Sequence, residues 1–145
     1  AALAVNLEAS RKMGASKAIA SFAIPLGNTI NMNGTAIMQV VATLFIAGCA
    51  GYDVTLSQLI VIALLALIAS AGTPAAPGAG AIILFTILSG LGYINDGALL
   101  AYSLILAINR PIEMLVTALN VVGDSATAIY VAKSEGMLNE DIYNS

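Results

Sequence analysis

The sequence predicts an all-α membrane protein with broken transmembrane helices and a re-entrant helical hairpin. Of its 145 residues, 59% are hydrophobic and 9% are charged, whereas an ordinary soluble domain has about 25% charged residues. Between Ala18 and Asn95 the only ionisable acid or base, apart from tyrosines and Cys49, is Asp53. Such a stretch cannot be the surface of a globular domain. Two clusters of helix-breaking residues interrupt it and predict the breaks.

The composition also excludes several classes of site. Cys49 is the single cysteine and there is no histidine, so we expect no internal disulfide and no metal cluster built from thiolates. No basic patch predicts a nucleic-acid partner, and nothing indicates covalent chemistry or an enzyme. The chain opens on Ala1 without a basic, cleavable leader, so we expect no signal peptide and interpret the sequence as a piece of a longer chain.

The first predicted element is a broken helix over residues 14–52. An apolar run over residues 15–30 ends in the sequence PLGNTINMNGT, residues 25–35, and a second apolar run follows over residues 36–50. Pro25, Gly27 and Gly34 are poor helix formers, and Asn and Thr side chains lie between them. This composition predicts an unwound break inside one membrane span.

The second element is a hairpin over residues 56–93. Its apolar runs, residues 56–70 and 80–93, are each roughly 20 Å long at about 1.5 Å per residue, which is short for a hydrocarbon core of about 30 Å. Between them, residues 72–80 contain two prolines and three glycines. We therefore expect the chain to enter the bilayer, turn and leave on the same side. A last transmembrane helix follows over residues 96–133, with a kink at Pro111.

The distribution of positive charge agrees with this topology. Arg11, Lys12 and Lys17 cluster before the broken helix, and Lys133 ends the last helix, so both ends are expected in the cytoplasm. The predicted loops at 51–54 and 93–96 contain no Lys or Arg, as external loops should. Residues 134–145 are then a cytoplasmic tail.

Two breaks in one short chain point to a binding site. Unpaired backbone groups are costly in lipid, so non-helical backbone at membrane depth is tolerated only where it is buried in protein or lines a watery cavity. Broken helices of this kind hold ions and substrates in secondary transporters. The alternative is that the glycines only permit tight helix packing. That would explain Gly90 and Gly92, but not two prolines beside three closely spaced glycines.

The last helix carries a polar stripe, defined by five residues that share one face at steps of three or four: Asn109, Glu113, Thr117, Asn120 and Asp124. An acid inside a membrane segment is a functional candidate. Glu113 could balance a substrate ammonium, while Asp124 and the Asn120 amide offer hard oxygen ligands for a small cation. Alternatively, Asp124 lies near the cytoplasmic interface and is merely solvated.

Two neighbours of the polar stripe differ from it. Val116 is an apolar residue on the same face. Arg110 is about 100° away around the helix, so we expect it to face the interface or another wall of the protein.

Three motifs resemble the dicarboxylate/amino acid:cation symporter family, which includes the glutamate and neutral amino acid transporters. NMNGT (31–35) resembles the break in the family's seventh helix, GTPAAPGAGAI (72–82) the tip of its second re-entrant hairpin, and NVVGD (120–124) the signature of its eighth helix. The motifs occur in the family's order, and the match covers nearly the whole chain. The resemblance implies that residues 1–13 end a first hairpin. It also implies that the chain is the C-terminal part of a mobile transport domain, in a homotrimer of the cell membrane held together by a scaffold domain.

The resemblance also implies residue roles. One sodium ion would be held by Asp124 and Asn120 with backbone carbonyls of Gly27 and Asn31. A second would be held by Thr29 with carbonyls of Ser70, Ala71 and Thr73, in a site that forms only when the hairpin closes. The residues implied to border the amino acid substrate are Met32, Thr35, Ala76, Gly80, Glu113, Val116, Thr117 and Asn120.

Three positions depart from the family pattern. Val116 stands where members with acidic substrates have an arginine, and valine cannot replace its bidentate contact with a carboxylate. Asn109 stands where many members have an aspartate that supports this arginine. Asn33 replaces the aspartate of the NMDGT motif, which makes a third sodium site doubtful.

These observations predict a sodium-coupled symporter that imports a small, neutral amino acid by an elevator-type movement. An alternative keeps the fold but takes a dicarboxylate or an acidic amino acid, with sodium or protons as the coupling ion and the missing arginine supplied by the first hairpin. A second alternative is a structural membrane subunit or passive channel. Sodium-dependent binding of an amino acid would argue against that last alternative.

Overall fold

The computed structural model describes residues 2–74, 76 and 78–145. These residues form the helices α1 (Ala2–Lys12), α2 (Lys17–Ile30), α3 (Asn33–Cys49), α4 (Leu56–Ala71), α5 (Ala79–Leu91), α6 (Asp96–Ser134) and α7 (Glu140–Tyr143). The predicted all-α class is confirmed. Three residues of the predicted elements lie outside the described residues: Ala1 of the first segment, and Ala75 and Pro77 of the hairpin tip.

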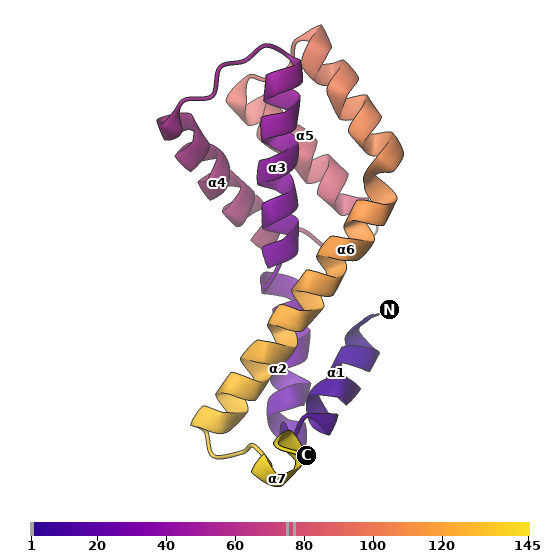
Figure 1. Ribbon diagram of the computed structural model, residues 1–145, viewed down its shortest axis with the longest axis vertical. Helices are drawn as coiled ribbons and strands as arrows, with labels where there is room; N and C mark the ends of the chain where they lie inside the picture. Colours follow the sequence, from indigo (N-terminus) through magenta and orange to yellow (C-terminus); the bar gives the residue numbers. More distant parts are fainter. Residues whose placement is uncertain (1, 75, 77) are drawn as a thin grey trace.

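The helices are arranged around one long axis (Figure 1). α2 and α3 follow one another along this axis, and α6 packs against both. α4 and α5 lie beside α3 at one end of the molecule, whereas α1 lies beside α2 at the other end. The break between α2 and α3 is therefore near the middle of the molecule, directly against α6.

Local sequence signals account for the helix ends around the hairpin. Thr55 and Gln58 form a capping box at the start of α4, which satisfies backbone N–H groups that have no partner within the helix. Gly78 and Gly92 flank α5 with left-handed φ angles of 85° and 75°, a conformation that glycine adopts without strain. The Asn95 side chain then accepts from Ala98 N at 2.8 Å and starts α6. The α4–α5 pair is thus a helical hairpin bounded by caps on both sides.

The largest buried apolar cluster lies where α3 to α6 meet. Ile46, Ile62, Leu84 and Leu88 pack together there with Tyr93. Elsewhere, many large apolar side chains are exposed, among them Phe22, Leu56, Ile68, Ile82 and Met114. By length and composition, the segments Lys17–Cys49 and Asp96–Ser134 could each cross a membrane.

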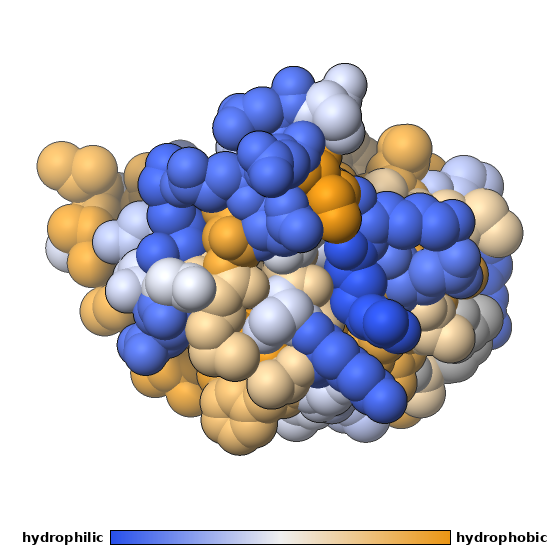
Figure 2. All heavy atoms as spheres, turned by 90° about the horizontal axis from the view of Figure 1, so that it is seen from below, coloured by the Kyte–Doolittle hydropathy of each residue, from blue (hydrophilic) through white to orange (hydrophobic). Residues whose placement is uncertain are grey.

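The end of the molecule formed by α1, α7 and the last turn of α6 is polar. Figure 2 views this end and shows hydrophilic side chains gathered over it, with hydrophobic side chains at its rim. Residues 134–145 fold back onto the turn between α1 and α2, where Ser16 N donates to Met137 O at 3.1 Å and Asn139 N donates to Gly14 O at 2.8 Å. The predicted tail is therefore part of the fold, and its cytoplasmic location stays a prediction.

The break in the first membrane span is shorter than predicted. Pro25 and Gly27 lie inside α2, which continues to Ile30, and Asn31 and Met32 alone separate α2 from α3. The expectation that Pro25 begins the break is wrong, because a proline removes one hydrogen bond of a helix and packing along the remaining turns can hold the helix together. α6 likewise continues through Pro111, and Figure 1 shows that it changes direction part-way along its length.

Candidate functional site

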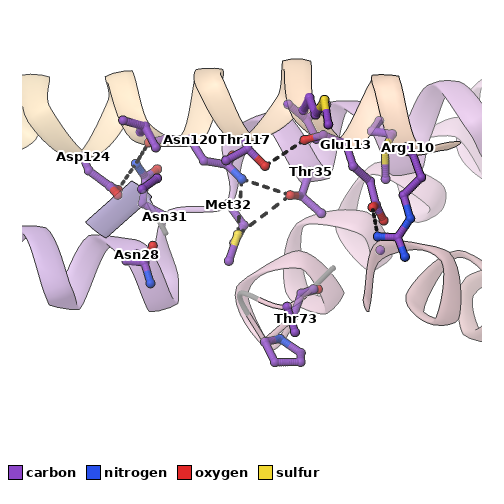
Figure 3. Close-up of a pocket in the computed structure, with 18 residues that line it drawn as sticks. Asn28, Asn31, Met32, Thr35, Thr73, Arg110, Glu113, Thr117, Asn120 and Asp124 are labelled. Atoms are coloured by element: carbon purple, nitrogen blue, oxygen red, sulfur yellow. Dashed lines mark hydrogen bonds and ion pairs between the residues drawn. The ribbon is translucent and has the colours of Figure 1, made fainter. Parts of the chain in front are cut away.

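A cavity of about 560 Å³ lies between the α2–α3 break, the tip of the α4–α5 hairpin and α6 (Figure 3). This volume lies within the range of small-molecule sites, about 300–1,000 Å³. The residues predicted to border the substrate all line it: Met32, Thr35, Ala76, Gly80, Glu113, Val116, Thr117 and Asn120. Their assignment to substrate binding stays a prediction.

Asp124 of α6 forms one end of the cavity. Its side chain is buried, and Oδ1 accepts a hydrogen bond from Asn31 Nδ2 at 2.8 Å. The backbone of Gly27 lies so close that a Cβ atom there would be 2.5 Å from the same oxygen. α2 can approach the carboxylate because residue 27 has no side chain. Three of the residues predicted for the first sodium site are thus brought together by α2, the break and α6.

Asn120, the fourth residue of that predicted site, holds the start of α3 (Figure 3). Its Oδ1 accepts from Gly34 N at 2.7 Å, while its Nδ2 donates to Thr35 Oγ1 at 3.1 Å and contacts Met32 Sδ at 3.3 Å. The Gly34 N–H is one of the donors that a helix N-terminus leaves without a partner within the helix. Asn120 therefore supplies the side-chain oxygen that the break needs.

Thr29, predicted for the second sodium site, shares no hydrogen bond with Ser70, Ala71 or Thr73 in the described structure. Thr29 is exposed, and its hydroxyl donates to Pro25 O within α2 at 3.2 Å. At the hairpin, Thr73 N donates to Ser70 O at 3.0 Å, so this carbonyl closes the end of α4. Thr73 lines the cavity, whereas Thr29, Ser70 and Ala71 do not. The predicted second site stays a prediction tied to hairpin closure.

Asn33, which bears on a third sodium site, lies outside the cavity. It is exposed, and its Oδ1 accepts from Gly34 N at 2.8 Å. The Asn33 amide thus shares the N–H of Gly34 with Asn120.

Glu113 forms the opposite end of the cavity and joins α6 to the hairpin. Its carboxylate accepts from Asn109 Nδ2 at 2.8 Å, from Arg110 Nη1 at 3.1 Å and from Gly78 N at 3.2 Å. The Gly78 N–H lies at the start of α5, where the helix dipole favours negative charge. The predicted polar stripe therefore reaches the cavity at both of its acids.

Arg110 also lines the cavity, and the expectation that it faces the interface or another wall is wrong. Residues three apart on a helix can touch, and a long guanidinium side chain can bend towards a carboxylate of opposite charge. In Figure 3 the Arg110 and Glu113 side chains lie side by side and are joined by a dashed line. The spacing of an arginine three residues before a glutamate, in an otherwise apolar stretch, was the signal that could have found it.

Gln39 of α3 is a second residue that sequence reasoning missed. It is fully buried, and its Nε2 donates to Gly80 O in the first turn of α5 at 2.8 Å. Its Oε1 is buried without a hydrogen-bond partner among the described residues. A single glutamine inside an apolar run was the available signal. Gln39 and Glu113 together attach the start of α5 to the rest of the molecule.

Comparison with protein-family models identifies the chain. Residues 1–134 match the model described as the sodium:dicarboxylate symporter family. The chain belongs to this family. The predicted resemblance is confirmed, and membership in a symporter family implies a membrane protein.

Among curated members of the sodium:dicarboxylate symporter family, the chain is similar to three kinds of transporter. It is 37% identical to the proton/sodium-glutamate symport protein of Bacillus caldotenax over 93% of this chain and 31% of that protein. It is 35% identical to excitatory amino acid transporter 2 of Homo sapiens over 85% of this chain and 21% of that protein. It is 33% identical to the proton/glutamate-aspartate symporter of Escherichia coli (strain K12), over 89% of this chain and 29% of that protein.

The names of these relatives bear on the predicted function. The relatives are transporters and not enzymes, as predicted, and the bacterial names describe symport coupled to cations. They name glutamate and aspartate, so they do not support the neutral substrate inferred from Val116. The alternative of an acidic substrate agrees with them better.

Proposed function

We propose that the chain is the C-terminal part of the transport domain of a symporter that couples an acidic amino acid to sodium ions or protons. Family membership and the names of the relatives support this proposal. The observation that carries it is the single cavity that connects Asp124 at the α2–α3 break with Glu113 and Arg110 at the hairpin tip. A coupling ion and a charged substrate would then occupy the two ends of one site.

Sodium is the first choice of coupling ion because of the ligand chemistry around Asp124. The carboxylate lies beside the last turn of α2, close to the backbone of Gly27, and hard oxygen ligands of this kind suit small, hard cations. Two sodium sites are proposed, the first at Asp124, Asn120, Gly27 and Asn31. The second would form at Thr29 and the carbonyls of residues 70, 71 and 73 when the hairpin closes. Asn33 makes a third site doubtful.

The two sides of the cavity, the α2–α3 break and the hairpin tip, would have different roles in transport. The hairpin tip would open and close over the substrate, and the closed transport domain would then cross the membrane in an elevator-type movement against a trimeric scaffold. In this scheme α4 and α5 form the re-entrant hairpin. The protein lies in the cell membrane, and its polar end with Arg11, Lys12 and Lys17 faces the cytoplasm.

A small neutral amino acid is the second candidate substrate, and Val116 favours it. This side chain lines the cavity at the position where acidic-substrate members of the family carry an arginine. The difference between the two candidates is one charge in the cavity, so a substrate panel separates them.

The test uses the full-length protein that carries this chain, reconstituted in liposomes with an imposed sodium or proton gradient. We expect uptake of radiolabelled L-aspartate or L-glutamate that requires one of the gradients and stops when an ionophore abolishes it. Uptake without any gradient would favour a passive channel. Stronger competition by L-alanine or L-serine than by every acidic amino acid would favour the neutral candidate.

A further inference from the structure

The charged side chains of the cavity can pair with the charges of an acidic amino acid only if an ion pair within the cavity is first broken. The charged side chains that line it within the described structure are Arg110, Glu113 and Asp124. An acidic amino acid brings one ammonium group and two carboxylates. A dehydrated carboxylate needs a cation or several donors, and Arg110 is the cation that the lining provides.

Arg110 has hydrogen-bonding capacity to spare. A guanidinium carries five N–H donors in a planar fork, and the contact to Glu113 uses Nη1. The Arg110 side chain remains 63% exposed, against 17% for Glu113. Its Nη2 lies 3.9 Å from the position that a Cβ atom on Gly78 would occupy, which places the fork at the hairpin tip. The free donors thus lie at the end of the cavity that the hairpin covers.

Glu113 keeps two hydrogen-bond donors when it releases Arg110. Its carboxylate keeps Asn109 Nδ2 at 2.8 Å and Gly78 N at 3.2 Å as donors. The ion pair itself is inexpensive to break, because a pair with one exposed partner contributes little to stability. A bidentate contact between a guanidinium and a carboxylate is stronger and more directional.

We propose that Arg110 is the specificity-determining residue that binds the side-chain carboxylate of an acidic amino acid. It does so by exchanging its ion pair with Glu113, which then binds the substrate ammonium. In the structure the two side chains form an ion pair (Figure 3). In the loaded cavity each pairs with the opposite charge on the substrate. This inference rests on the proposed function and identifies, within this chain, the cation that Val116 does not supply.

The exchange makes selectivity depend on two substrate groups at once. A neutral amino acid such as L-alanine offers no second carboxylate to take Arg110 from Glu113. A dicarboxylate such as succinate offers the carboxylate but no ammonium, so Glu113 would lose its cation without a replacement. L-aspartate differs from each of these by one group, which makes the three compounds a matched set of probes.

The first experiment compares Arg110→Gln with wild type in the reconstituted full-length protein. Inhibition constants against radiolabelled L-aspartate are measured for L-aspartate, succinate and L-alanine. We expect Arg110→Gln to lower the affinity for L-aspartate and for succinate at least tenfold, which is about 1.4 kcal/mol, and to leave that for L-alanine within about twofold. Arg110→Lys should fall between, since it keeps the charge and loses the fork. Unchanged L-aspartate affinity in Arg110→Gln would overturn the proposal.

Two controls separate specificity from folding. Arg11→Gln removes the same charge at the polar end of the molecule, outside the cavity, and should leave all three affinities unchanged. Sodium-dependent thermal stabilisation reports on Asp124, which is 14 residues or about 21 Å along α6 from Arg110, and should persist in Arg110→Gln. If Arg110→Gln loses the sodium-dependent stabilisation, the test passes to Arg110→Lys. An Arg110→Lys variant that keeps this stabilisation and binds L-aspartate as tightly as wild type would overturn the proposal.

The second experiment tests the exchange itself with Glu113→Gln. This variant frees Arg110 from its partner and removes the anion that would bind the ammonium. The preference for L-aspartate over succinate should therefore fall at least tenfold, whereas a merely structural role of Glu113 would weaken both compounds equally and would contradict the exchange. A wild-type protein with no cation-dependent uptake of L-aspartate would instead refute the proposed function, so the two failures are distinguishable.

Discussion

The α2–α3 break and the tip of the α4–α5 hairpin both interrupt helices beside the same cavity, yet they are attached to the molecule differently. The break is held against α6 by side chains from both sides: Asn31 Nδ2 donates to Asp124 at 2.8 Å, and Gly34 N donates to Asn120 at 2.7 Å. The tip is attached at its α5 side, where Gly78 N donates to Glu113 at 3.2 Å and Gly80 O accepts from Gln39 at 2.8 Å.

The packing around two glycines sharpens this contrast. A Cβ atom on Gly34 would lie 2.5 Å from the backbone oxygen of Val116, whereas one on Gly80 would lie 2.9 Å from the terminal methyl of Met38. Backbone cannot move without separating two helices, but a methionine end can turn aside. The cavity therefore has a rigid wall at the α2–α3 break and an adaptable wall at the hairpin tip, which is the arrangement that a site with a closing lid requires.

The largest effect is expected at the rigid wall. Gly34→Ala should lower the free energy of unfolding by about 1–3 kcal/mol, because the new methyl group must separate α3 from α6. Thermal or denaturant unfolding of the purified protein measures this. Gly48→Ala is the matched control, since nothing lies within 4 Å of the added methyl group, and it should be neutral or slightly stabilising. Equal losses in the two variants would show that the close approach at Gly34 is unimportant.

The next effect concerns the cation at the rigid wall. Asp124→Asn should weaken sodium binding at least tenfold, or about 1.4 kcal/mol, because it removes the carboxylate that lies beside Gly27 and Asn31. Isothermal titration with sodium provides the measurement. Glu135→Gln removes an acid just beyond the end of α6 and should bind sodium as wild type does. Equal sodium affinities in the two variants would remove Asp124 from the proposed site.

A smaller effect is expected at the adaptable wall. In a background with Cys49→Ser, Ala76→Cys should react with a thiol reagent at least about threefold more slowly when sodium and substrate are present, since ligands favour the conformation that they bind. Met137→Cys, at the polar end of the molecule, should react at a constant rate. Labelling at position 76 that ignores both ligands would contradict a closing hairpin.

The smallest effect is expected for Gly80→Ala. The free energy of unfolding should change by no more than about 0.5 kcal/mol, because the Met38 side chain can repack around the added methyl group. Unfolding measurements on Gly80→Ala and Gly34→Ala under the same conditions test the contrast between the walls directly. A loss at Gly80 as large as that at Gly34 would show that the hairpin side is equally rigid.

Several features of this protein could be predicted from the sequence because they depend on local chemistry. Apolar runs bounded by Gly, Pro and capping residues predict helices, and the observed bounds of α4 and α6 agree closely with the predicted ones. Steps of three and four residues place Asn109, Glu113 and Asn120 on one face of a helix wherever that helix packs. The residues predicted to border the substrate were implied by the family resemblance, and they line one cavity.

Tertiary structure decided the features that depend on what lies opposite a residue. Pro25 stays within a helix because α2 packs along α6, and no local pattern describes that packing. Arg110 turns into the cavity because Glu113 and the hairpin tip meet there. Gln39 has a role only because the start of α5, 41 residues further along the chain, is folded against it. Local chemistry is enough to specify which helices form and which of their faces are polar. Their partners were decided only when distant segments packed together, since hydrogen bonds and ion pairs act over a few ångströms.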